Sequence, residues 1–481
     1  MSRINTNVSS LISVRVLNGN NANLQTSLQR LSTGYRINQG KDDPAGLIAS
    51  EALRAEQRST EVAISNAQRA DAIIGTAEGS LGEISNLLVS LQGLVNNSAN
   101  KAGLSQDEKD ANQLQVDSIL STINRISNSA SFQGVKLLNG TYDYTTSGLA
   151  TTSAFTSVSI NSAKVGSTTL SVTVAVVTSA QTGQLNFAGS STGLNGASTV
   201  SIAGNKGTVQ LSFASSTKSS AIVASVNQFK DSTGVQATLS SDNKSVKFTS
   251  TGYGASQFVS ITSNNSTAFS TKDTSGVTNT SDSGRNATVT VNGTAVQSDG
   301  LNVKVVTANL EADLTLNSAV NTNGSSKVFG VTGGGATFSL GAQVNTANTA
   351  SIGLGNINTG SVGKYVSSGT VYTLGDLGSG KSAAVNSGDT TLAQNIVNQA
   401  IKDIAGLRGR LGAFQKNVLG STINSLNVAL ENVASSNSAI RDTDFATETA
   451  NLTRSQILVQ AAGSVLSQAN QSPQSVLRLL S

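Results

Sequence analysis

The chain has 481 residues, of which 12% are charged and 4% are aromatic, and it contains no Cys, no His and only two Pro. Without His or Cys it can form neither a Ser-His-Asp triad nor a Cys-His pair, and disulfides cannot stabilise it. A net charge of +4 is too small for the basic surface of a nucleic-acid-binding protein. We therefore expect no catalytic residues, no cofactor, no metal site and no nucleic-acid partner.

The sequence also lacks the signals of membrane insertion and of cleaved secretion. No run of about 18 consecutive apolar residues is present, as a transmembrane helix would require. The N-terminus (MSRINTN) has no uninterrupted apolar segment followed by a small-residue cleavage site, so it does not read as a Sec signal peptide. Taken alone, these observations favour a cytoplasmic protein.

The first ~140 residues have the apolar spacing of helices, with steps of three and four. Near the start, the predicted helix face consists of Val14, Leu17, Leu24, Leu28 and Leu31. Asn21 fills the missing position of this face. It either sets register or marks a helix break, because residues 18–21 (NGNN) are poor helix formers.

A longer coiled-coil seam follows, in the unbroken alternation Ile74, Ala77, Leu81, Ile84, Leu88, Leu91 and Val95. Residues 105–108 (SQDE) form a Ser-x-x-Glu capping box that predicts the start of another helix.

The middle of the chain, roughly residues 141–390, is rich in Ser, Thr, Gly and Asn and has a period of two. The sequence TVTV-NG-TAV at 288–296 predicts a β-hairpin with an Asn-Gly turn. A second hairpin is expected from strands at 235–239 and 246–248. Further strands are expected at 170–177 and 209–213, and one short helix at 220–230. This region suits one or two β-rich domains.

The last ~90 residues return to helical spacing. One predicted face contains Ile404, Leu407, Leu411, Phe414 and Val418. Nearer the end, one row of a seven-residue frame contains Phe445, Leu452, Val459, Leu466 and Leu480, and its partner row contains Ala462, Ala469 and Val476. The fold class is therefore α + β and multidomain. Helical coiled-coil or bundle arms at the two ends pair with each other and flank a central β-rich insert.

Specific motifs in both helical regions resemble those of the bacterial flagellins. At the start these are residues 31–38 (LSTGYRIN), 42–47 (DDPAGL) and 132–140 (FQGVKLLNG). At the end they are residues 412–417 (GAFQKN), 431–434 (ENVA), 440–446 (IRDTDFA) and 469–477 (ANQSPQSVL). The resemblance covers roughly residues 1–140 and 395–481, with several independent motifs in the family's order.

The resemblance implies a division into five segments. Residues 1–40 and 438–481 are filament-core helices, residues 41–140 and 391–437 build a helical rod, and residues 141–390 form the variable outer region. In this family the two ends are disordered in the monomer and fold into paired helices on assembly. The filament-core assembly residues are then Val14, Leu17, Leu24, Leu28, Leu31, Phe445, Leu452, Val459, Leu466, Val476 and Leu480. The rod-seam residues are Ile74, Leu81, Ile84, Leu88, Leu91, Val95, Ile404, Leu407, Leu411, Phe414 and Val418.

The resemblance also implies the function. The protein polymerises into a flagellar filament for motility, after export through the flagellar type III channel, and is extracellular. This overturns the cytoplasmic interpretation. Implied partners are other copies of the chain, the flagellar cap, hook–filament junction proteins and an export chaperone. Alternatives are a hook–filament junction protein or, in another class, a secreted adhesin; an enzyme is disfavoured.

One stretch departs from the family pattern. Many flagellins that activate the animal innate flagellin receptor carry Arg-x-Arg-Glu-Leu in the first long helix, where this chain has residues 90–94 (SLQGL). Ser90, Gln92 and Gly93 replace the two Arg and the Glu. Charge-assisted hydrogen bonds from those groups cannot form here, so the resemblance implies a poor receptor ligand.

Overall fold

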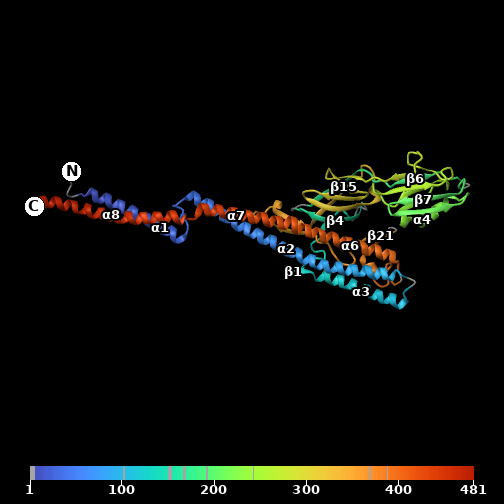
Figure 1. The fold of residues 1–481 in the computed structure, drawn as a ribbon, viewed down its shortest axis with the longest axis horizontal. Helices are drawn as coiled ribbons and strands as arrows, with labels where there is room; N and C mark the ends of the chain where they lie inside the picture. Colours follow the sequence, from blue (N-terminus) through green and yellow to red (C-terminus); the bar gives the residue numbers. More distant parts are fainter. Residues whose placement is uncertain are drawn as a thin grey trace. The chain divides into compact units, whose positions relative to one another are not determined.

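The computed structural model describes residues 6–100, 103–149, 154–165, 169–190, 193–241, 243–367, 370–386 and 388–480, with side chains to residue 471. By its internal contacts the chain divides into two units, 1–72 with 339–349 and 412–481, and 73–338 with 350–411. Helices dominate both ends and strands the middle (Figure 1), which confirms the predicted fold class. Among the described residues, no helix is both long enough and apolar enough to cross a membrane.

The helices of the first unit are α1 (Val8–Thr33), α7 (Ser421–Arg441) and α8 (Phe445–Leu480), with a 3₁₀ turn, η2 (Thr346–Asn348). The long helix α2 (Pro44–Ser98) begins in this unit. α1 runs without a break through residues 18–21, so the poor helix propensity of that run is overridden. Its first turn is capped by Asn7, whose side chain accepts a hydrogen bond from the Ser10 amide, and it ends at Gly34 in the left-handed conformation, with φ of 76°.

The helices of the second unit are α3 (Gln106–Ser129), α4 (Ser219–Gln228), α5 (Lys230–Thr233) and most of α6 (Thr390–Ala413), with 3₁₀ turns η1 (Ser318–Val320) and η3 (Leu374–Leu377). α3 starts at the predicted capping box. The Ser105 side chain accepts from the Glu108 amide, and the Glu108 carboxylate accepts from the Ser105 amide. These bonds hold the pKa of Glu108 below its usual value.

The β region has an eight-stranded antiparallel sheet of order β3-β18-β5-β14-β15-β16-β17-β4. Its strands are β3 (Tyr144–Ser147), β4 (Phe155–Ala163), β5 (Leu170–Thr178), β14 (Thr288–Val291), β15 (Thr294–Asp299), β16 (Asn302–Val306), β17 (Leu310–Leu316) and β18 (Ser326–Gly334). β14 and β15 form the predicted hairpin. Asn292 and Gly293 both have positive φ, at 49° and 83°, as a type I′ turn requires. Alternate residues of these strands, including Val289, Leu314 and Phe329, fill one core.

Two four-stranded sheets, β12-β6-β10-β9 and β13-β11-β7-β8, share a second core with α4. Their strands are β6 (Gln184–Phe187), β7 (Ser198–Gly204), β8 (Gly207–Phe213), β9 (Val235–Leu239), β10 (Val246–Ser250), β11 (Phe258–Ser263), β12 (Thr271–Lys272) and β13 (Ser281–Ser283). The predicted β9–β10 hairpin and the short helix are both confirmed. Phe269 stacks on Phe187 at the centre of this core, with ring centroids 4.2 Å apart.

The remaining short strands are β1 (Ser131–Phe132), β2 (Val135–Lys136), β19 (Ala336–Ser339), β20 (Thr349–Ile352), β21 (Tyr365–Ser367) and β22 (Thr370–Tyr372). Between β20 and α6 the chain returns along α3. Gln113 donates to the Leu377 carbonyl at 2.9 Å and accepts from the Val385 amide at 2.8 Å, and Asn124 accepts from the Thr359 amide at 2.9 Å. This return segment was expected within the outer β region, but its contacts are with a helix of the predicted rod.

Candidate assembly surface of the terminal helices

The two ends of the chain pair as antiparallel helices, α1 and α8, which lie side by side in Figure 1. Along each helix, the residues turned away from solvent recur with steps of three and four. We call this set the terminal seam. It consists of Ser10, Ser13, Leu17, Asn20, Leu24, Ser27 and Leu31 on α1, and Glu448, Leu452, Ser455, Val459, Ala462, Leu466 and Ala469 on α8.

The terminal seam contains some of the predicted assembly residues and not others. Leu17, Leu24, Leu31, Leu452, Val459 and Leu466 are half-buried within it. Val14 and Leu28 are 38% and 49% exposed and Phe445 is 57% exposed, so the chain by itself does not bury these three. Val476 and Leu480 lie outside the described side chains. For Val14 and Leu28 the difference arises because the second row of the α1 seam is polar, whereas the prediction assumed apolar residues in both rows. Phe445 lies in the same row as Leu452 but is the first residue of α8.

A large apolar surface remains on the outside of the helix pair. It consists of Val8, Leu11, Ile12, Val14, Val16 and Leu28 of α1, and Phe445, Ile457, Leu458 and Val465 of α8. Scattered exposed apolar residues are ordinary on soluble proteins, but a concentration of them on two adjoining helices is typical of protein–protein interaction sites.

Polar contacts join the two helices along their length. The Asn7 side chain donates to the Ala469 carbonyl at 2.8 Å, the Ser10 hydroxyl donates to Asn470 Oδ1 at 2.7 Å, and Asn20 donates to the Leu458 carbonyl at 3.3 Å. Backbone carbonyls are accepting in two of these bonds. These two bonds therefore help to hold the helices together but depend little on the side chains of α8.

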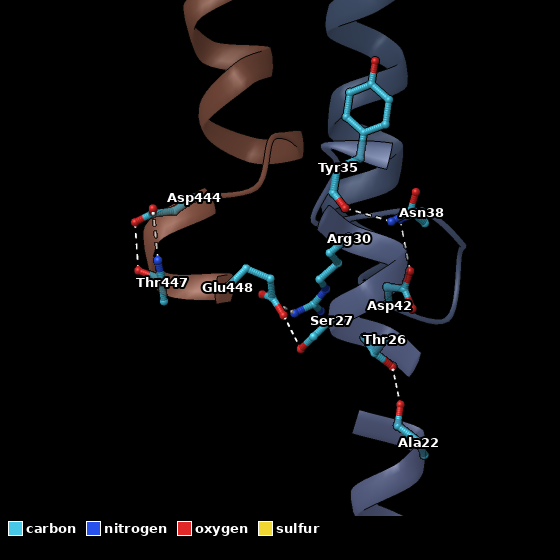
Figure 2. Close-up of polar contacts among 10 residues, drawn as sticks. All are labelled: Ala22, Thr26, Ser27, Arg30, Tyr35, Asn38, Asp42, Asp444, Thr447 and Glu448. Atoms are coloured by element: carbon cyan, nitrogen blue, oxygen red, sulfur yellow. Dashed lines mark hydrogen bonds and ion pairs between the residues drawn. The ribbon is translucent and has the colours of Figure 1, made fainter. Parts of the chain in front are cut away.

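A charged cluster lies in the seam near the start of α8 (Figure 2). The Glu448 side chain points toward α1, where the Ser27 hydroxyl donates to its Oε1 at 2.5 Å and Arg30 Nη1 lies 3.5 Å from its Oε2. Asp444 precedes the first residue of α8 and caps the helix, because its carboxylate accepts from the Ala446 amide and the Thr447 hydroxyl. The Thr447 bonds hold the pKa of Asp444 below its usual value.

The bends that follow α1 and precede α8 are bonded to each other. The Arg36 amide donates to the Arg441 carbonyl at 2.7 Å, and the Thr443 amide donates to the Gly34 carbonyl at 2.9 Å. The Arg441 guanidinium lies 4.7 Å over the Tyr35 ring. These contacts fix the end of the helix pair at residues 34–36 and 441–443.

The pair of acidic residues before α2, Asp42 and Asp43, belongs to a turn. Asp42 accepts from the amides of Asn38 and Gln39, and Asp43 accepts from the Gly46 amide in the first turn of α2. The bonds from Gln39 and Asn38 lower the pKa of Asp42. One carboxylate oxygen of each aspartate is thus directed at the backbone of the turn, and Asp43 Oδ2 also lies 3.7 Å from Arg36 Nη1.

The predicted rod-seam residues of α2 are in the core. Ile74, Leu81, Ile84, Leu88, Leu91 and Val95 are all 0–1% exposed. On α6, Ile404, Leu407 and Leu411 are also buried. An ion pair between Arg408 and Glu78, at 2.7 Å, joins these two helices beside the core.

Phe414 and Val418 depart from this pattern, because α6 continues into a π-helix, η4 (Phe414–Gly420). A π-helix accommodates an extra residue, so the buried face moves by one position. Leu419 is accordingly buried, while Phe414 and Val418 are only half-buried. The 3-4 alternation in sequence cannot signal such an insertion, since the same spacing fits an uninterrupted α-helix.

Residues 90–94, where the sequence departs from the receptor-activating pattern of many flagellins, lie on α2. Ser90 and Gly93 are exposed, and the Ser90 hydroxyl is turned back to the Asn86 carbonyl at 3.1 Å. Gln92 is half-buried and donates to Asn398 of α6 at 2.8 Å. Two of the three positions are thus open to a partner, whereas Gln92 already has a role in joining two helices.

Gly93→Ala is expected to raise the free energy of unfolding by about 1 kcal/mol, because Gly lowers helix stability by that amount relative to Ala. A Cβ at Gly93 meets nothing within 4 Å, so no clash opposes the gain. Urea denaturation followed by circular dichroism measures the change. The matched control is Gly34→Ala. Its Cβ is equally unobstructed, but its φ of 76° is unfavourable for Ala, so this variant is expected to lose stability. Equal changes in the free energy of unfolding of the two variants would contradict this explanation.

The architecture defines a class of protein whose helical ends pair with each other and carry an exposed apolar face, with β domains inserted between them. Residues 4–143 match the family model described as bacterial flagellin N-terminal helical region, and residues 394–480 match the bacterial flagellin C-terminal helical region. "Flagellin D" of Vibrio anguillarum is 31% identical over 489 residues, covering 99% of each chain. "Flagellin" of Salmonella muenchen is 30% identical over 514 residues, again covering 99% of each. The chain belongs to the bacterial flagellin family.

Solved structures resemble the chain more distantly. The flagellar cap protein FliD D1-D2-D3 domains from Escherichia coli are 18% identical, with a TM-score of 0.28, over 53% of this chain and 62% of that one. FliC from Burkholderia pseudomallei is 15% identical, with a TM-score of 0.23, over 72% and 98% respectively. Scores at this level do not establish a common fold.

Proposed function

We propose that this chain is the structural subunit of an extracellular flagellar filament and that it polymerises through α1 and α8. The observation that carries the proposal is the apolar face of the paired ends, from Val8 to Leu28 on α1 and from Phe445 to Val465 on α8. Covering this face with neighbouring subunits removes apolar surface from water, which drives association. The family membership supports the same role, which needs no catalytic site.

Seeded polymerisation tests this function. Filaments are dissociated by heat, the monomer is cooled and short seeds are added, and the product is viewed by negative stain. Long filaments of constant diameter support a filament subunit. A short zone that stops growing would favour a hook–filament junction protein, and monomers that bind surfaces without polymerising would favour an adhesin; either result contradicts the proposal.

The two ends are proposed to become ordered on assembly, as the family resemblance implies. In the single chain α1 packs against α8, and a helix pair with apolar residues on its outside is a poor independent unit. Hydrogen exchange followed by mass spectrometry should show residues 8–33 and 445–471 exchanging quickly in monomer and slowly in filaments. Equal protection in both states would contradict the proposal.

The chain is further proposed to be a weak activator of the animal innate flagellin receptor. Ser90 and Gly93 present no charge at exposed positions. A reporter-cell dose curve for monomer should show a gain of about tenfold or more for Ser90→Arg with Gly93→Glu, since 1.4 kcal/mol of contact energy corresponds to a factor of ten. Adding Gln92→Arg completes the Arg-x-Arg-Glu pattern but removes the hydrogen bond to Asn398. The free energy of unfolding of this triple variant is therefore measured as well. Equal potency of the original chain and the charged variants would show that these positions do not govern recognition.

A further inference from the structure

Glu448 is the only acidic residue in the sequences of α1 and α8, and it is 6% exposed. Each of its carboxylate oxygens has a separate partner on α1, Ser27 for Oε1 and Arg30 for Oε2 (Figure 2). A buried carboxylate is costly unless it is paired and hydrogen-bonded. Glu448 is therefore stable in this position only beside a hydrogen-bond donor and a positive charge, and an apolar surface is not sufficient.

The apolar residues of the seam do not need a specific partner residue. Leu17, Leu24 and Leu31 recur every seven residues on α1, and Leu452, Val459 and Leu466 do so on α8. When one helix slides by seven residues, most of these side chains again meet apolar side chains. A second copy of α8 presents the same apolar row. Apolar packing alone thus leaves both the register and the choice of partner poorly defined, and in coiled coils a polar seam residue commonly defines them.

The charged cluster distinguishes these alternatives. A slip of one heptad that brings Gly463 opposite Ser10 moves Glu448 to the place of Ser455, away from Ser27 and Arg30, and leaves both charged groups without their partner. Pairing of α8 with another α8 buries Glu448 against a seam that contains no basic residue. In both cases a charged group loses its partner, which is strongly unfavourable in a buried position. The backbone bonds at residues 34–36 and 441–443 also oppose a slip within one chain, but they do not depend on the seam side chains, so Glu448 adds a side-chain preference for this register.

We propose that Glu448, together with Ser27 and Arg30, is a positioning residue that selects α1 as the partner of α8 and sets the register of the pair. This inference rests on the proposed function, because the pairing concerned is the one used in the filament. The other side-chain contacts along the seam then strengthen a register that Glu448 defines.

Disulfide trapping tests the proposal directly, because the sequence contains no Cys and introduced pairs are therefore unambiguous. Ser10→Cys with Asn470→Cys reports the observed register, since these side chains touch at 2.7 Å far from Glu448. Ser10→Cys with Gly463→Cys reports a register shifted by one heptad. Asn470→Cys alone reports contacts between two α8 helices as a dimer on a non-reducing gel. All are oxidised in assembled filaments.

Glu448→Leu is expected to lower the ratio of observed to shifted disulfide by about tenfold or more, as a change of 1.4 kcal/mol would. It should also raise the Asn470→Cys dimer above its level in the Glu448 background. Glu448→Gln keeps an acceptor for Ser27 but no charge for Arg30, so an intermediate ratio is expected. Ser455→Ala is the matched control. Ser455 lies one heptad along the same row, and among the described residues its side chain has no bond to α1, so the ratio should not change.

An unchanged ratio in Glu448→Leu filaments would overturn the proposal. Should that variant form no filaments, Glu448→Gln takes its place, and an unchanged ratio there is equally decisive. A fall caused by Ser455→Ala as large as that caused by Glu448→Leu would also overturn it, because any polar seam residue would then suffice. If the cysteine variants with Glu448 intact fail to polymerise although folded, the failure lies with the proposed function instead.

Discussion

Leu466→Asp is expected to abolish filament growth while the second unit of the chain stays folded. Leu466 lies in the terminal seam, where it is half-buried against α1. An aspartate at this position places a charge that has no partner in an apolar contact. This costs several kcal/mol, and the defect recurs in every subunit. Swimming assays and negative-stain filament lengths measure the effect, and circular dichroism of the purified monomer reports the fold.

Ser467→Asp is the matched control, since it introduces the same side chain at the neighbouring exposed position. Filaments are expected to form with this variant, at most with reduced stability. Normal motility and filament length in Leu466→Asp would show that the terminal seam does not carry the assembly. Loss of filaments in both variants would show instead that any new charge at this end of α8 is harmful.

Removal of residues 148–329 is expected to leave polymerisation intact and to give a thinner filament. Ser147, the last residue of β3, is paired with Gly330 in the middle of β18, so a two-residue Asn-Gly turn closes the gap. The deletion removes most of the two β cores and keeps the return segment that bonds to α3. Negative stain measures the diameter, and seeded growth measures the rate of polymerisation.

The extent of this deletion matters. A longer one, residues 148–385, also removes the partners of Gln113 and Asn124 and leaves these buried or half-buried groups of α3 unsatisfied. We expect that chain to lose the fold of its helical region and to form no filaments. A shorter deletion that folds and is exported but never polymerises would show that the β region supplies essential contacts.

The sequence predicted the features that local chemistry determines. The heptad spacing of Ile74 to Val95, the Ser105 capping box and the Asn292-Gly293 turn depend on neighbours within a few residues, and all three have the expected structure. The pairing of the two ends was predicted from their matching helical spacing, and the family motifs imply the same pairing.

What the sequence did not reveal depends on distant or polar contacts. The π-helix at Phe414 leaves no mark in the apolar spacing. The return segment at 353–386 has little period-two pattern, and its place beside α3 follows from hydrogen bonds to Gln113 and Asn124. Apolar spacing cannot point to Glu448, because this residue is charged and its partners on α1 are polar. Its signal was available, however, since Ser13, Asn20 and Ser27 recur every seven residues opposite it.

The central claim is that α1 and α8 form the assembly surface of a filament. A reconstruction of the filament at side-chain resolution tests it most directly. The account predicts that α1 and α8 pair in the inner wall, that Leu466 and Glu448 face α1, and that Leu11, Ile12 and Ile457 are covered by neighbouring subunits. Terminal helices on the outer surface, with these apolar residues still in contact with solvent and the β region forming the subunit contacts, would contradict it.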